Sequence, residues 1–385
     1  MGKWLKKRMD EIAEFNPRES IKKGTIAKKI AMDKLRPFCR DVPGYELEPF
    51  SGGTKFRNGD TIMARITPCL ENGKTAKVSV LDEDEVGFGS TEYIVLRAKK
   101  GYDSDFIYYL VTSPVIREPA IKSMVGSSGR QRVQTDVVQG LKVNVPELDE
   151  QRAIAGIMKS LDDKIAANRE INENLEQQLH MLYTKIFAKS TMDTVLGDAV
   201  KTASGGTPSR KHGEYYDHGN ICWVKSKELL DGYLLNTEEH INELAITKSS
   251  AKLLPSYSVL IAMYGATVGA YSIISKPMAC NQAVCALLSN ENYPYTYLFQ
   301  VACESQQKLI NFAVGSAQQN ISQVLIKQLP IHSNKGNIQE FHSLAQPIHK
   351  RIESLNAENI LLADTRDTLL PKFMSGELDV SKLDI

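Results

Sequence analysis

Residues 182–187 read Leu-Tyr-Thr-Lys-Ile-Phe, and residues 369–374 read Leu-Leu-Pro-Lys-Phe-Met. The two segments are 187 residues apart, and the same offset pairs Met9 with Leu196. It also pairs three apolar residues with three others, namely Ile157, Leu161 and Ile165 with Leu344, Ile348 and Ile352. An offset this long is that of a domain plus a helix, not of a solenoid repeat. The sequence therefore predicts a pseudo-two-fold internal repeat that presents two similar surfaces to a partner.

Each repeated segment ends a long amphipathic stretch. From about 149 to 188, and again from 338 to 374, apolar residues recur at spacings of three, four and seven. A helix of about 38 residues spans roughly 57 Å, more than its own domain needs. We therefore favour two antiparallel helices that form a coiled coil over helices that each pack only on their own domain. The residues expected to pair the helices or dock a partner are Ile157, Leu161, Ile165, Leu175, Leu182, Leu344, Ile348, Ile352, Leu362 and Leu369.

The remaining sequence alternates short β-rich runs, such as 61–66 and 282–288, with turns rich in Gly, Pro and Asn. Together with the helices, this pattern predicts an α+β fold of four blocks. They are a mixed α/β domain at 1–148, a helix at 149–190, a second mixed domain at 191–335, and a second helix with a tail at 336–385.

The composition is that of a globular protein, with 42% hydrophobic and 24% charged residues in 385. No apolar run reaches 18 residues, and acidic residues follow the basic segment 1–8, so we expect a cytoplasmic protein without a membrane partner. The six cysteines form no CxxC pair, which predicts free thiols and no metal site. The net charge of +1 argues against indiscriminate coating of nucleic acid, although lysines such as Lys28, Lys29 and Lys34 could form a local basic face.

Catalytic motifs are scarce. Residues 72–75, Asn-Gly-Lys-Thr, contain the end of a phosphate loop, but Pro68 replaces the required earlier glycine, so a turn is favoured. The acidic run 82–85 could bind a cation, yet a solvated turn is the more common structure. No Gly-x-Ser-x-Gly elbow is present. We therefore predict no catalytic residue, which disfavours a self-contained nucleotide-modifying enzyme.

Several binding motifs, in contrast, follow a recognisable order. Residues 204–210 (Ser-Gly-Gly-Thr-Pro-Ser-Arg), 221–226 (Ile-Cys-Trp-Val-Lys-Ser) and 315–322 (Gly-Ser-Ala-Gln-Gln-Asn-Ile-Ser) resemble a target recognition domain of the specificity (S) subunits of type I restriction-modification systems. Residues 146–152 resemble the start of that family's first conserved helix, and 366–378 its closing helix. The resemblance covers essentially the whole chain.

The first half departs from the family pattern at one place. Residues 15–18 read Phe-Asn-Pro-Arg where the second half has Gly-Gly-Thr-Pro, whereas 126–133 still match 315–321 in position. Divergent recognition domains on similar helices are what the resemblance implies, since each half would read a different sequence.

The resemblance implies a non-catalytic subunit that recognises double-stranded DNA. Each mixed domain would read one part of a bipartite asymmetric site, and the helices would set the unread spacer at about one helical turn, roughly 34 Å. Methyltransferase subunits, two of them expected, would dock on the chain and bring S-adenosylmethionine, while restriction and translocase subunits would bring ATP and Mg²⁺. No cofactor is then expected to bind this chain directly. The alternative is a coiled-coil scaffold that joins two protein- or peptide-binding domains.

Candidate DNA contacts follow from side-chain chemistry. Glycine-rich turns let backbone amides approach phosphates, whereas Arg, Asn and Gln can make bidentate contacts with base edges. The candidate base readers are Arg130, Arg132, Gln318, Gln319 and Asn320, and the candidate phosphate partners are Lys74, Lys211 and Lys225. Further candidates at the DNA surface are Arg65, Ser127, Gly206, Thr207, Arg210 and Tyr264. An ordinary turn or surface position is as common for each, and packing is favoured over base stacking for Trp223 and Tyr264.

Overall fold

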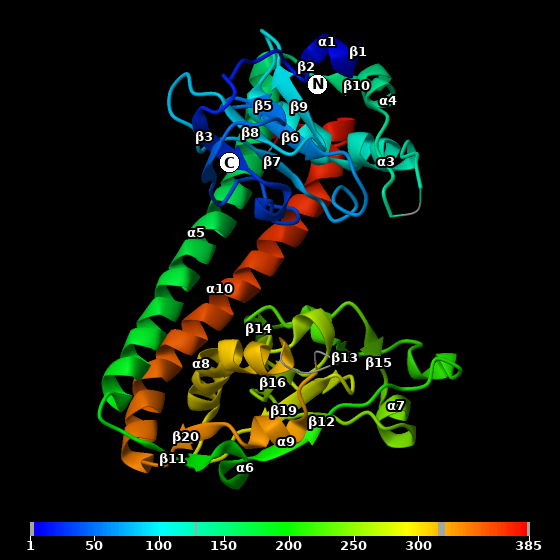
Figure 1. Ribbon diagram of the computed structural model, residues 1–385. Coiled ribbons are helices and arrows are strands. Elements are labelled where there is room, and N and C mark those ends of the chain that lie inside the picture. The colour runs from blue at the N-terminus through cyan, green and yellow to red at the C-terminus, as the bar shows by residue number, and fades with distance from the viewer. Residues whose placement is uncertain (1–3, 128, 315–319, 383–385) are drawn as a thin grey trace. The chain divides into compact units, whose positions relative to one another are not determined.

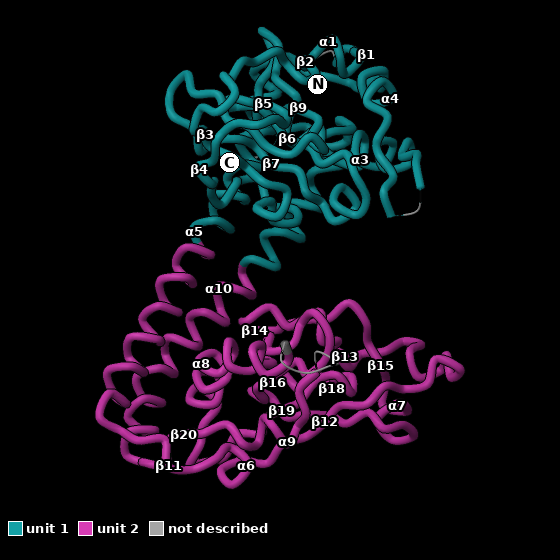
Figure 2. The backbone as a smooth tube through the Cα atoms, viewed as in Figure 1, with its two compact units in different colours: residues 1–167, 359–385 teal, residues 168–358 magenta. Residues whose placement is uncertain are grey.

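The computed structural model describes residues 4–127, 129–314 and 320–382, and it has an α+β fold (Figure 1). Two compact units divide the chain, residues 1–167 with 359–385 (unit 1) and residues 168–358 (unit 2) (Figure 2). Both divisions fall inside the long helices α5 (Leu148–Phe187) and α10 (Lys335–Ser375), so each helix contributes a segment to each unit. No helix in the described ranges is long and apolar enough to cross a membrane.

Unit 1 contains two four-stranded sheets, in the orders β2-β9-β6-β7 and β4-β3-β8-β5, and a two-stranded sheet β1-β10. Its strands are β1 (Leu5–Arg8), β2 (Ala13–Phe15), β3 (Ile26–Ile30), β4 (Glu46–Pro49), β5 (Thr54–Phe56), β6 (Thr61–Ala64), β7 (Thr75–Lys77), β8 (Gly87–Gly89), β9 (Tyr93–Ala98) and β10 (Lys142–Val145). Its shorter helices are α1 (Met9–Ile12), α2 (Ser104–Thr112), α3 (Pro114–Lys122) and α4 (Thr135–Gly140).

Unit 2 contains a five-stranded sheet β12-β19-β16-β17-β14, a three-stranded sheet β15-β13-β18 and a two-stranded sheet β11-β20. Its strands are β11 (Met192–Val195), β12 (Lys201–Ser204), β13 (Ile221–Val224), β14 (Gly232–Leu234), β15 (His240–Ile241), β16 (Val259–Ala262), β17 (Tyr271–Ile274), β18 (Ala279–Cys280), β19 (Val284–Leu288) and β20 (Pro330–His332). Its shorter helices are α6 (Leu196–Ala199), α7 (Glu243–Lys248), α8 (Tyr295–Val314) and α9 (Gln323–Lys327).

The predicted repeat extends from the helices to the topology of the sheets. In each unit the first strand, β1 or β11, pairs with the strand that precedes helix α5 or α10. One central sheet of unit 1 runs β2-β9-β6-β7, and the corresponding run in unit 2 is β12-β19-β16-β17. The parallel pair β3/β8 likewise corresponds to the parallel pair β13/β18. Met9 and Leu196, which the offset pairs, are both fully buried.

Within each unit the segments of α5 and α10 run antiparallel, as predicted. In unit 2 the Asn168 Nδ2 donates to Glu358 Oε2 at 2.9 Å, and further along α5 the Tyr183 ring packs edge-on against the Phe341 ring, with centroids 5.6 Å apart. As the residue numbers rise along α5, those of the contacting residues on α10 fall, so the two segments are antiparallel. Around this pairing, α5 also packs against α8, since the Tyr183 and Tyr297 ring centroids are 6.2 Å apart.

The buried face of the helix pair differs in detail from the predicted one. Among the predicted pairing residues Ile165 and Ile352 are buried, and Leu344 is 48% exposed. The others are half-buried, namely Ile157, Leu161, Leu175, Leu182, Ile348, Leu362 and Leu369. Asp162 and Asn168 hold buried positions on α5 instead. A search for apolar periodicity passes over polar residues, so it did not find Asp162 and Asn168. Leu344 is not buried in the helix pair, and its role in docking a partner stays a prediction.

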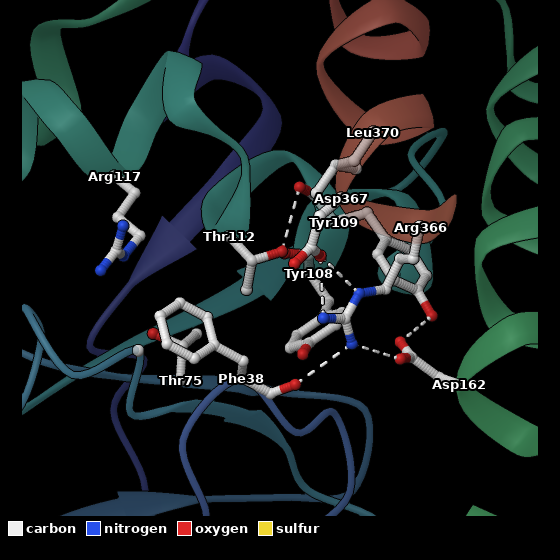
Figure 3. A pocket seen from close by; sticks show the side chains of 11 residues that line it. Phe38, Thr75, Tyr108, Tyr109, Thr112, Arg117, Asp162, Arg366, Asp367 and Leu370 are labelled. Atoms are coloured by element: carbon white, nitrogen blue, oxygen red, sulfur yellow. Dashed lines mark hydrogen bonds and ion pairs between the residues drawn. The ribbon is translucent and has the colours of Figure 1, made fainter. Parts of the chain in front are cut away.

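A buried ion pair connects the two long helices to α2 and a loop within unit 1 (Figure 3). Arg366 Nη1 donates to Asp162 Oδ1 at 2.8 Å and to the Phe38 carbonyl oxygen at 3.1 Å. The Tyr109 hydroxyl of α2 donates to Asp162 Oδ2 at 2.7 Å, and burial together with Asp162 raises the pKa of Tyr109. These contacts join α2, α5, α10 and the loop at Phe38 at one point.

Candidate nucleic-acid interface

The two units bring corresponding loops together in the same way. In unit 1 the segment after β6 lies beside the segment before α4, because Val133 N donates to Arg65 O at 2.8 Å and the next residue, Ile66, bridges to Arg132. In unit 2 the segment after β16 lies beside the segment before α9. Here Ile321 N donates to Met263 O at 2.9 Å, and Tyr264 bridges to Asn320. Candidates far apart in the sequence, Arg65 with Arg132 and Tyr264 with Asn320, are therefore neighbours.

In unit 1 the two arginines share a carboxylate that the sequence analysis missed. Arg132 Nε donates to both carboxylate oxygens of Glu92 at 3.0 Å, and Arg132 Nη2 donates to Glu92 Oε1 at 2.7 Å. Arg65 Nε lies 3.9 Å from Glu92 Oε2, and Arg65 N donates to Glu92 O at 2.9 Å. The hydrogen bonds from Arg132 lower the pKa of Glu92, so this carboxyl stays ionised at neutral pH. Only the antiparallel pairing of β6 with β9 brings Glu92 to this position.

Ser127 and Arg130 lie in the exposed turn between Val125 and Arg132. Val125 and Arg132 close this turn with reciprocal backbone hydrogen bonds of 3.0 and 2.9 Å. Arg130 N donates to Ser127 O at 3.0 Å, and both residues are exposed. The turn therefore presents Ser127 and Arg130 beside Arg132.

Gly206 packs against backbone rather than opening a site. Its N–H donates to Cys280 O at 2.8 Å, and its carbonyl oxygen accepts from Trp223 Nε1 at 3.1 Å. The neighbouring Thr207 is exposed, and its hydroxyl donates to Gln282 Oε1. Trp223 is only 3% exposed, which confirms packing as its role.

Gly206→Ala is expected to destabilise unit 2 by about 1–3 kcal/mol, the usual cost of an overpacked site. A Cβ at this position would lie 2.2 Å from the carbonyl oxygen of Ser250, which is backbone and cannot move aside freely. Denaturant unfolding followed by tryptophan fluorescence in a Trp4→Phe background, which leaves Trp223 as the single tryptophan, measures the change. Gly213→Ala is the matched control, because nothing lies within 4 Å of a Cβ there. Equal stability of the two variants would contradict the prediction.

Besides Arg65 and Arg132, three further predicted cations have partners inside the protein. Arg210 pairs with Glu239 and lies over the Tyr216 ring, 4.3 Å from its centroid. Lys225 Nζ lies 2.8 Å from Glu239 Oε1, and hydrogen bonds with Glu239 and then Glu238 raise the pKa of Lys225. Lys74 Nζ donates to the carbonyl oxygen of Met32 at 2.9 Å. DNA contacts by these residues stay predictions, as do those by the exposed Lys211, Tyr264 and Asn320.

The other predicted features also have a structural outcome. Gln318 and Gln319 lie outside the described residues. The acidic run 82–85 pairs with the basic N-terminal part, since Lys28 Nζ lies 3.0 Å from Asp82 and 2.9 Å from Glu85. No group of three His, Cys, Asp or Glu side chains in the described ranges is placed to hold a metal ion. All six cysteines are free thiols.

Comparisons with known proteins identify the family. A model of the type I restriction modification DNA specificity domain matches residues 1–177 and again residues 191–341. The specificity subunit of the type I restriction enzyme MjaIX from Methanocaldococcus jannaschii is 25% identical over 74% of this chain and 71% of its own length. That of HindI from Haemophilus influenzae is 22% identical, over 88% of this chain and 89% of its own length.

A solved structure shows the same fold. The S subunit of a type I restriction-modification system from M. genitalium aligns with a TM-score of 0.58 at 14% identity, covering 97% of this chain and 96% of the other. Because the family model matches both halves, it accounts for the repeat as two copies of one domain. The chain belongs to the family of DNA specificity subunits of type I restriction-modification systems.

Proposed function

We propose that each unit reads one part of a bipartite, asymmetric site in double-stranded DNA. The observation that carries this proposal is the corresponding loop pair in the two units. The backbone hydrogen bonds are the same, from Val133 to Arg65 and from Ile321 to Met263, but the side chains around them differ. A shared frame with different side chains suits two readers of different sequences, since base edges are distinguished by side-chain chemistry.

The two long helices set the unread spacer between the half-sites and dock the methyltransferase subunits. Two such subunits are expected, one for each repeat. Both α5 and α10 contribute to both units, as a spacer element must. The helices also carry exposed apolar side chains that the chain itself does not cover, among them Met181 at 61%, Leu361 at 67% and Leu344 at 48% exposed. Apolar side chains exposed in this way are suited to a protein partner.

The chain contributes recognition and no catalytic step. S-adenosylmethionine binds to the methyltransferase subunits of the complex, and ATP and Mg²⁺ bind to its restriction and translocase subunits. The role of this chain is then to hold the DNA site and to position the enzymes on it.

Insertion of seven residues into both helices is expected to lengthen the spacer of the recognised site. The insertions go between 167 and 168 and between 358 and 359, where the units divide and where Asn168 already pairs with Glu358. Seven residues preserve the helical stripe and add about 10 Å, or roughly three base pairs. Co-expression with the methyltransferase, followed by single-molecule sequencing of DNA methylation, gives the spacer directly.

The wild-type chain and a variant with seven residues inserted after Gly101, an exposed turn of unit 1, are the controls. Both are expected to keep the original spacer. Methylation without any sequence motif would contradict the recognition role and favour the scaffold. A motif whose spacer is unchanged by the helix insertions would contradict the role of the helices.

A further inference from the structure

The carboxylate of Glu92, which Arg65 and Arg132 share in unit 1, suggests which base this unit recognises. We propose that Arg132, held in place by Glu92, reads a guanine in the half-site bound by unit 1, and that Glu92 is a positioning residue for this contact. The inference rests on the proposed function, because it requires that unit 1 reads DNA. It goes further by naming one base, one reader and the residue that holds the reader.

The geometry of Arg132 leaves the reading edge of its guanidinium available. Glu92 takes the Nε and Nη2 side of the group, at 3.0 and 2.7 Å. The opposite edge, formed by Nη1 and the second hydrogen of Nη2, has one long contact of 3.4 Å from Nη1 to the Arg130 carbonyl oxygen. The side chain of Arg132 is 44% exposed. An arginine that presents two parallel N–H groups matches the O6 and N7 acceptors of guanine in the major groove.

Glu92 is itself held firmly, so it can orient Arg132 before DNA binds. It lies directly before β9, and its carbonyl oxygen accepts from Arg65 N at 2.9 Å. Its side chain is only 23% exposed. A reader that is already oriented loses less conformational entropy on binding than a free arginine does.

The charges of the cluster favour an approach to DNA. Arg65 is the second cation, with Nε 3.9 Å from Glu92, and no described residue accepts a hydrogen bond from this buried Nε. Two arginines against one carboxylate leave one net positive charge. The cluster thus holds its reader by an ion pair and remains attractive to a polyanion.

Unit 2 has the same backbone frame with different chemistry. Met263 N donates to Ala283 O at 2.8 Å, as Arg65 N does to Glu92 O, and Asn320 takes the place of Arg132. Arg65, Glu92 and Arg132 of unit 1 thus correspond, in this order, to Met263, Ala283 and Asn320 of unit 2. Guanine reading by a buttressed arginine is therefore a property of unit 1 at this position.

Arg132→Ala, Arg132→Lys and Glu92→Gln test the proposal in the full chain with its methyltransferase subunits, by sequencing of DNA methylation. The wild-type motif should contain a guanine in one half-site that Arg132→Ala relaxes to other bases. The expected loss of discrimination at that base pair is about tenfold to hundredfold. Arg132→Lys keeps the charge but not the fork, and it should relax the same position. Glu92→Gln should relax it partially, and the other half-site should keep its full sequence in all three variants.

The matched control is Glu48→Gln, which weakens a partly exposed surface pair in the same unit, where Lys29 Nζ lies 2.9 Å from Glu48. It should leave both half-sites unchanged. The reciprocal variant Ala283→Glu with Asn320→Arg should create a preference for guanine in the second half-site. This gain does not depend on the stability of the unit 1 variants.

The outcomes separate the two levels of inference. A bipartite wild-type motif that Arg132→Ala leaves intact, or relaxes at a base pair without guanine, overturns the proposal and leaves the proposed function standing. Relaxation by Arg132→Ala without any effect of Glu92→Gln overturns the positioning role of Glu92. A wild-type chain that directs no sequence-specific methylation overturns the proposed function itself.

Discussion

Arg366→Ala is expected to destabilise unit 1 by about 3–5 kcal/mol, the usual cost of breaking a buried ion pair from one side. Asp162 is 6% exposed and would lose the Arg366 guanidinium, with the Tyr109 hydroxyl still donating to its carboxylate. The Phe38 carbonyl oxygen would also lose its donor on Arg366. The variant therefore leaves the buried carboxyl group of Asp162 and the carbonyl group of Phe38 without their Arg366 partner (Figure 3).

Native-state hydrogen exchange measures this effect unit by unit, which matters because a chain of two compact units need not unfold in one step. Amides of α2 and of β9 should exchange faster in Arg366→Ala, while those of α8 in unit 2 serve as the internal reference. Lys29→Ala is the control, because it breaks a partly exposed surface pair with Glu48 and should leave the exchange of α2 amides close to that of the wild type. The apolar double variant Asp162→Leu with Arg366→Met should regain most of the lost stability. A loss below 1 kcal/mol in Arg366→Ala would show that the pair contributes little.

The architecture could be predicted from sequence because its strongest signals are local and repeated. The stripe of apolar residues along 149–188 predicted a helix, and the structure has α5 at Leu148–Phe187. The offset of 187 residues predicted a duplication. In agreement with it, Met9 and Leu196, which this offset pairs, are both fully buried. Periodicity could not place the buried face accurately, since Asp162 and Asn168 occupy it and a polar residue carries no hydrophobic signal.

The candidate interface was only partly predictable, because it depends on contacts between distant residues. Arg65 and Arg132 were each plausible from their chemistry, but their proximity comes from the hydrogen bond between Val133 and Arg65. Glu92 had no sequence signal, because a glutamate at the start of a strand is common and its meaning depends on Arg132.

Counts of charged residues in the sequence also mislead, because they do not show which cations are paired with distant carboxylates. Lys28 and Lys29 looked like parts of a basic face, yet Lys28 pairs with Asp82 and Glu85, and Lys29 pairs with Glu48. Their hydrogen bonds with these carboxylates raise the pKa values of both lysines. A site keeps a net positive charge only where its cations outnumber their carboxylate partners. This is the case where Arg65 and Arg132 share the single carboxylate of Glu92.

The stability of unit 2 is expected to fall as the pH drops below about 6.5, and His349 on α10 is the main cause. This side chain is fully buried, with Nδ1 3.1 Å from the Tyr233 hydroxyl and the Phe299 ring centroid 5.2 Å away. Nε2 has no hydrogen-bond partner among the described residues. Burial, and to a smaller extent His342, lowers the pKa of His349 to about 3 in the folded protein.

The sign of the effect follows from the proton balance. Between pH 6.5 and 3 the unfolded chain binds a proton at His349 that the folded chain does not, so acid favours unfolding. The free energy of unfolding should fall by about 1.4 kcal/mol per pH unit below 6.5, or roughly 2 kcal/mol by pH 5. His342 contributes in the same direction, since burial lowers its pKa as well.

His349→Gln removes the titrating group and keeps an acceptor for Tyr233, so its unfolding free energy should depend less on pH between 7 and 5 than that of the wild type. The absolute stability of the variant does not enter this comparison, because only the slope against pH is used. Hydrogen exchange at α8 amides, corrected for the intrinsic effect of pH, measures the slope in unit 2. If His349→Gln kept the wild-type slope, the acid sensitivity would have to arise from groups other than His349. Glu353 is not such a group, because burial raises its pKa and its protonation in the folded state therefore opposes acid unfolding.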